Sequence, residues 1–82
     1  MSAVRKRAAK VVVAFASTGD AMAVEAAARV GGVPGRMIPV PQTVSAGCGL
    51  AWCASAEERD ALVQALEGAG LAYEALHEVE LY

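Results

Sequence analysis

The hydrophobic and polar positions of the chain follow two periods, which together predict six secondary-structure elements. A continuous apolar run over residues 11–16 is typical of a strand that is buried on both faces. Residues 71–81 alternate between apolar side chains and glutamates, as a strand with one face in solvent does. Two shorter apolar runs predict strands over 35–40 and 49–54.

Capping residues predict where two helices begin and end. Ser17, with Asp20 three residues later, approximates a capping box for a helix over residues 18–30, which Gly31-Gly32 ends. Ser55 to Glu58 form a second capping box, and Gly70 closes the helix that follows. The apolar stripes of these helices are Ala23, Ala27 and Val30 in the first, and Leu62, Ala65, Leu66 and Ala69 in the second.

The order of these elements, β-α-β-β-α-β, predicts an α+β fold. It is the split βαβ pattern of a ferredoxin-like sandwich, in which two helices lie on one face of a four-stranded antiparallel sheet. The 82 residues suffice for one small domain, expected over 11–82, after a flexible basic tail over 1–10. A multidomain enzyme and a disulfide-stapled secreted scaffold are therefore excluded.

Composition and charge restrict the partners. The chain is 56% apolar and 20% charged with a net charge of −2, as expected of a globular domain. From Glu57 onward seven acidic residues stand against one base, Arg59, which argues against a nucleic-acid-binding face. The longest uncharged run, 37–56, contains prolines and glycines that a membrane helix of that length would not favour. We expect a cytoplasmic protein whose two cysteines are free thiols.

One segment, Ser45-Ala46-Gly47-Cys48-Gly49, could carry chemistry. Glycines on both sides of Cys48 allow backbone N–H groups to approach its sulfur closely. Such donors stabilise the thiolate, which is the nucleophilic form of cysteine. From the residues alone, Cys48 is either a reactive thiol of this kind or a buried structural cysteine.

The other chemically capable residues are expected to be structural. Cys53 is interpreted as an inert core thiol within its strand, and Trp52 as a core residue. His77, the single histidine, is expected to be packed or on the surface. With no CxxC motif and no second histidine, no metal site is expected. No cofactor is expected either, because the glycine-rich segment 31–35 follows a helix, the reverse of a phosphate-binding loop.

Three segments, 15–21, 36–41 and 45–51, resemble a family of short bacterial and archaeal proteins described as selenium/sulfur (Se/S) carrier protein-like. The similarity covers about residues 11–79, and the family's central cysteine-glycine pair is matched by Cys48-Gly49. One departure is Gln42, which stands where the family often has a basic residue after the second proline.

The resemblance implies a carrier rather than a stand-alone enzyme. Cys48 would hold sulfur or selenium as a persulfide or selenenylsulfide, and relay it from a donor protein to an acceptor. Gly47 and Gly49 would shape its loop, with Ser45 nearby. The alternative function is a regulatory or assembly module with a structural Cys48, which dimerises through a strand edge or binds a small metabolite. The sequence does not distinguish sulfur from selenium.

Overall fold

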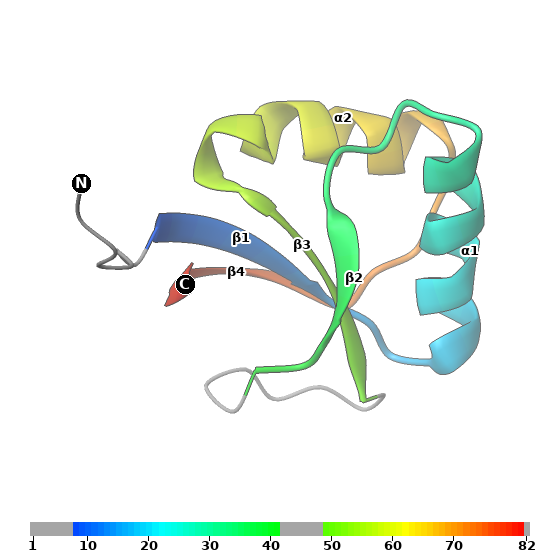
Figure 1. Ribbon diagram of the computed structural model, residues 1–82. Helices are drawn as coiled ribbons and strands as arrows, with labels where there is room; N and C mark the ends of the chain where they lie inside the picture. Colours follow the sequence, from blue (N-terminus) through cyan, green and yellow to red (C-terminus); the bar gives the residue numbers. More distant parts are fainter. Residues whose placement is uncertain (1–7, 42–48, 82) are drawn as a thin grey trace.

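The computed structural model describes residues 8–41 and 49–81, and their elements follow the predicted order (Figure 1). The strands are β1 (Ala8–Ala14), β2 (Arg36–Pro39), β3 (Leu50–Ser55) and β4 (Ala75–Leu81). The helices are α1 (Thr18–Arg29) and α2 (Arg59–Gly68), and a short 3-10 helix, η1 (Ala56–Glu58), leads into α2. The six predicted elements are confirmed, and only η1 was not predicted.

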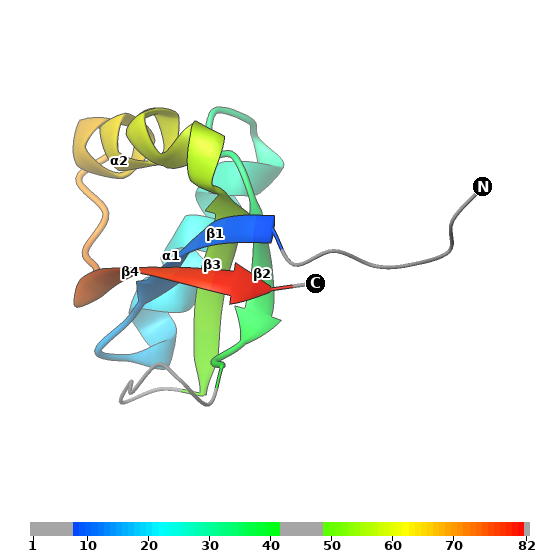
Figure 2. The ribbon, with the colours of Figure 1, turned by 90° about the vertical axis from the view of Figure 1, so that its left-hand side faces the viewer.

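The four strands form one antiparallel sheet in the order β2-β3-β1-β4. β1 lies in the middle of this sheet, which confirms that the continuous apolar run belongs to a central strand. Figure 2 shows the sheet with the two helices packed against it. Buried residues of α1 and α2 join one cluster with residues from a single sheet face, so the ferredoxin-like prediction is confirmed.

The first and last strands begin at different residues from those predicted. β1 starts at Ala8 and ends at Ala14, because β4 is long enough to pair with it from Ala8 to Ala14. Lys10 is therefore part of the sheet, between Ser55 of β3 and Val79 of β4. β4 starts only at Ala75 instead of residue 71.

The main core lies between the sheet and the helices. Alternate residues of β1 and β3 enter it, and its buried members are Val11, Val13, Phe15, Ala21, Val24, Trp52, Ala54, Leu62 and Leu66. In α1 the prediction of the apolar stripe was wrong: Ala21 and Val24 are buried, whereas Val30 is 88% exposed. An alanine-rich helix carries small apolar residues on several stripes, so periodicity alone does not select the buried one.

Side chains at the helix ends confirm the predicted caps. The Asp20 backbone N–H donates to Ser17 Oγ at 3.2 Å, at the start of α1. The Ser55 backbone N–H and hydroxyl both donate to Glu58 Oε1, at 3.3 and 3.1 Å. Gly31 and Gly32 follow α1 with φ of 97°, the left-handed conformation that ends a helix.

The opposite side of the sheet, which we call the open face, is covered by no helix among the described residues. Cross-strand register places on it Lys10, Val12, Ala14, Arg36, Ile38, Ala51, Cys53, Ser55, Ala75, His77 and Val79. Most of these side chains are apolar. Lys10 and Arg36 place two positive charges on the open face, next to the C-terminal end of β3. Glu78 of β4 points to the helix side, where its Oε2 lies 3.6 Å from Arg59 Nε.

No described helix combines the length and the apolar character that crossing a bilayer requires.

Candidate functional site

The predicted loop site lies at the β2–β3 connection, and most of it falls outside the described residues. Ser45, Gly47 and Cys48 are in the segment 42–48, so their roles stay predictions. The chain on either side of this segment is held together, because the Val40 N–H donates to the Gly49 carbonyl oxygen at 3.1 Å. Gly49 itself is exposed at the start of β3.

Substituting Gly49 with alanine should leave the fold unchanged. Gly49 does not have a positive φ, and an added Cβ would have no neighbour within 4 Å. We therefore expect the free energy of unfolding of Gly49→Ala to lie within about 0.5 kcal/mol of wild type, measured by urea denaturation. A loss of more than about 1 kcal/mol would contradict this geometry.

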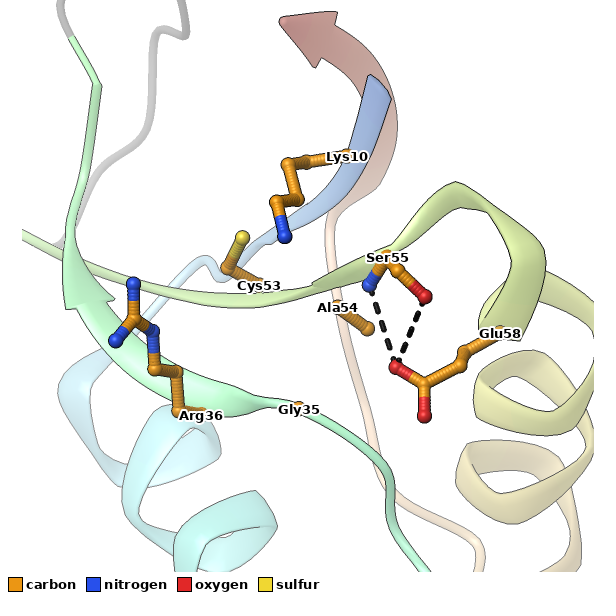
Figure 3. A pocket seen from close by; sticks show the side chains of 7 residues that line it. All are labelled: Lys10, Gly35, Arg36, Cys53, Ala54, Ser55 and Glu58. Carbon is orange, nitrogen blue, oxygen red and sulfur yellow. Dashed lines mark hydrogen bonds between the residues drawn. The ribbon is translucent and has the colours of Figure 1, made fainter. Parts of the chain in front are cut away.

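A cavity of about 230 Å³ lies on the open face at the other end of β3 (Figure 3). It is lined by Lys10, Gly35, Arg36, Cys53, Ala54, Ser55 and Glu58. β1, β2 and β3 each contribute side chains, because Arg36 pairs across from Cys53 and Lys10 across from Ser55. Sequence reasoning missed this site, since nothing in the sequence showed that Lys10 and Arg36 lie beside Cys53.

Cys53 is the thiol of this cavity. It is 6% exposed, so the prediction of a buried residue is confirmed. However, it belongs to the open-face cluster with Val12, Ala14 and Ala51 and not to the core beneath the helices. Burial raises the pKa of the Cys53 thiol, and the positive charges of Lys10 and Arg36 only partly offset this effect. The thiol is therefore protonated at neutral pH.

The two cations beside Cys53 are available to a ligand. Across residues 8–41 and 49–81, neither Lys10 nor Arg36 forms an ion pair, whereas Arg59 contacts Asp60 and Glu78. The one carboxylate in the cavity wall, Glu58, accepts two hydrogen bonds from Ser55. Among the described residues, the cavity thus holds two cations that form no ion pair and one carboxylate that accepts hydrogen bonds from Ser55. This balance of charge favours the binding of an anion.

Gly35 forms part of the cavity wall and lies close against Trp52 and Cys53 of β3. Its φ is +107°, and a Cβ at this position would collide with the Cys53 carbonyl oxygen and lie 2.6 Å from Trp52 Nε1. The indole N–H of Trp52 donates to the Pro34 carbonyl oxygen at 2.7 Å. Trp52 is 3% exposed within the main core, which confirms its predicted structural role. These contacts hold the start of β2 against Cys53.

Alkylation should separate the two cysteines. We expect iodoacetamide to modify Cys48 at least about tenfold faster than Cys53 in the folded protein at pH 7.5, because Cys53 is buried and its thiol has a raised pKa. Mass spectrometry of peptides after timed quenching measures both rates. In urea the two rates should become similar. Equal rates in the folded protein would contradict the assignment of Cys53 as the protected thiol.

His77 is half-buried on the open face, opposite Val12 of β1. This agrees with a packed or surface histidine. In the described ranges no three His, Cys, Asp or Glu side chains come together as they would to hold a metal ion.

A family model matches most of the chain. The model of the family described as "Putative Se/S carrier protein-like" matches residues 10–78. This range runs from within β1 to within β4 and includes the Cys48-Gly49 pair. Searches of curated proteins and of solved structures found no match to the chain.

Proposed function

Because the chain belongs to the Se/S carrier protein-like family, we propose that it carries a sulfur or selenium atom on a cysteine thiol and relays it between proteins. The observation that carries the proposal is the family match over 10–78, which includes the Cys48-Gly49 pair. Cys48 is the proposed carrying thiol, with Gly47, Gly49 and Ser45 around it. The proposal locates this chemistry in the cytoplasm, where thiols are kept reduced.

The described residues around the loop support access to a partner. The hydrogen bond between Val40, directly after β2, and Gly49, directly before β3, fixes the two described ends of the β2–β3 connection to each other. Gly49 is exposed, and a Cβ built on it would meet nothing within 4 Å, so the described residues leave Gly49 open to another protein. A carrier needs such an approach, because its thiol must meet a donor and then an acceptor.

The proposed reaction is thiol–persulfide exchange. The Cys48 thiolate attacks the outer sulfur of a donor persulfide, and the donor's sulfur–sulfur bond breaks as the new bond forms. The donor leaves as a thiolate and takes up the proton that Cys48 released. Delivery repeats the step in the other direction, with the acceptor thiolate attacking the outer sulfur on Cys48. No net oxidant or reductant is consumed.

Loading by a small donor tests this function. The reduced protein is incubated with inorganic polysulfide, desalted, blocked with an alkylating agent and digested, and mass spectrometry locates added sulfur. We expect Cys48 to gain one sulfur atom. A Cys48→Ser variant should lose that modification while keeping the wild-type melting temperature. Absence of added sulfur on Cys48 in the wild-type protein would contradict the proposal.

The alternative, an assembly module with a structural Cys48, is favoured by one observation. β4 is an edge strand of seven residues, and within the described chain no other strand pairs with its outer side. The same loading experiment separates the two functions. A module of this kind would show no sulfur on Cys48, and its sedimentation coefficient would increase with protein concentration as copies associate.

A further inference from the structure

We propose that Cys53 is a second sulfur-accepting thiol, and that its persulfide places the outer sulfur between Lys10 and Arg36. This inference rests on the thiol–persulfide chemistry of the proposed function but assigns it to a different residue, toward the end of β3 that is farther from Gly49. Cys53 lies four positions after Gly49, about 13 Å along an extended strand. The two thiol sites are therefore separate.

The arrangement around Cys53 differs from that of an ordinary buried cysteine. Its side chain points into a cavity of about 230 Å³, and in the described chain its sulfur makes no hydrogen bond (Figure 3). Lys10 from β1 and Arg36 from β2 line the same cavity, and both act electrostatically on the sulfur. A cysteine that served only to fill apolar space would need neither a cavity nor two unpaired cations.

The cavity suits the persulfide better than the thiol. The Cys53 sulfur is desolvated, which disfavours its negative charge. The outer sulfur of a persulfide lies one sulfur–sulfur bond, about 2.05 Å, further from Cβ and so further into the cavity. A persulfide is also a stronger acid than the parent thiol, so its outer sulfur carries the negative charge that Lys10 and Arg36 attract. The volume of about 230 Å³ exceeds what one sulfur atom requires.

The cavity selects a small donor. Part of its wall is exposed, at Gly35, Arg36 and Glu58, so solutes can enter, but Cys53 is too deeply buried for direct contact with a protein surface. We therefore infer a low-molecular-weight polysulfide or persulfide anion as the donor. The Cys53 thiolate attacks the terminal sulfur of the donor, and the bond between that sulfur and the rest of the donor breaks. The donor leaves as an anion shortened by one sulfur and takes up the proton that Cys53 lost.

The test uses the Cys48→Ser variant, so that all loading reports on Cys53. After incubation with inorganic polysulfide, peptide mass spectrometry should find one added sulfur on Cys53, more slowly than on Cys48 of the wild type. A Cys48→Ser, Cys53→Ser double variant should gain none. Sulfur on Cys48 but never on Cys53 would overturn this inference and leave the carrier function intact. Sulfur on neither cysteine would overturn both.

Charge variants test the role of the two cations. In the Cys48→Ser background, Lys10→Gln and Arg36→Gln should each raise the polysulfide concentration for half-loading of Cys53 about fivefold, the effect of losing one partly exposed charge contact. The matched control is Arg29→Gln, which removes an exposed cation of α1 that pairs with Glu25 outside the cavity. An equal half-loading concentration in all three variants would overturn the proposed role of Lys10 and Arg36.

Discussion

Replacing Gly35 with alanine should lower the free energy of unfolding by about 3 kcal/mol or more, one of the largest effects of any single methyl group in this domain. Two costs add at this position. The φ of +107° lies in the region that L-residues avoid, and the new Cβ would collide with the Cys53 carbonyl oxygen. Relief would require β2 to move away from β3, which would also open the cavity wall beside Cys53.

Gly31→Ala separates these two costs. Gly31 has a φ of 97°, but a Cβ there would meet nothing within 4 Å. Its substitution should therefore show the backbone strain alone, about 1 kcal/mol. Urea denaturation of both variants measures the difference. Equal losses of stability would show that the close contact of Gly35 with β3 contributes nothing.

Truncating Phe15 to alanine should cost about 3 to 5 kcal/mol of the free energy of unfolding. Phe15 directly follows β1, is fully buried, and is among the largest side chains of a core built mostly from valine and alanine. Small neighbours on strands leave little that can move into the space it would vacate. For 82 residues the total stability is expected to be about 4 to 12 kcal/mol, so this single change could unfold much of the population.

Two variants keep that prediction measurable if Phe15→Ala does not fold. Phe15→Leu retains most of the buried volume and should cost roughly 1 kcal/mol. Met22→Ala, at a large apolar residue that is 47% exposed, should change the free energy of unfolding by less than about 0.5 kcal/mol. Thermal and urea denaturation give the values. A larger loss for Met22→Ala than for Phe15→Leu would contradict the placement of the core.

The fold was predictable because local signals and the global architecture agree. The apolar run 11–16 identifies β1 as a buried strand, and the caps at Ser17 and Ser55 and the glycines after α1 locate the ends of helices. The order of the elements then leaves few ways to pair four strands. The predictions were wrong where the local sequence pattern is compatible with more than one arrangement. The first case is the buried stripe of the alanine-rich α1. The second is the start of β1, where residues 8–10 precede the apolar run but pair with β4. The third is the start of β4, where Leu71 and Tyr73 continue an alternating pattern but pack on the helix side.

The cavity was not predictable, because it depends on register between strands far apart in the sequence. Lys10 appeared to belong to a basic tail, and Arg36 was predicted only as part of the short strand 35–40. Only the pairing of Lys10 with Ser55 and of Arg36 with Cys53 brings both cations to one thiol. A shift of one residue in either pairing would send these side chains to the other face. The Cys48 site was predicted from a resemblance and concerns residues outside the described part of the chain.

Delivery of sulfur is the measurement that tests the central proposal most directly. The wild-type protein is loaded with polysulfide, freed of excess donor, and mixed with a small acceptor thiol, while intact mass and peptide mapping follow the added sulfur over time. The carrier account predicts that the sulfur leaves Cys48 as the acceptor persulfide appears in equal amount, and that Cys48→Ser delivers far less. A protein that never acquires sulfur on Cys48, or whose Cys48→Ser variant delivers as much as the wild type, would contradict it.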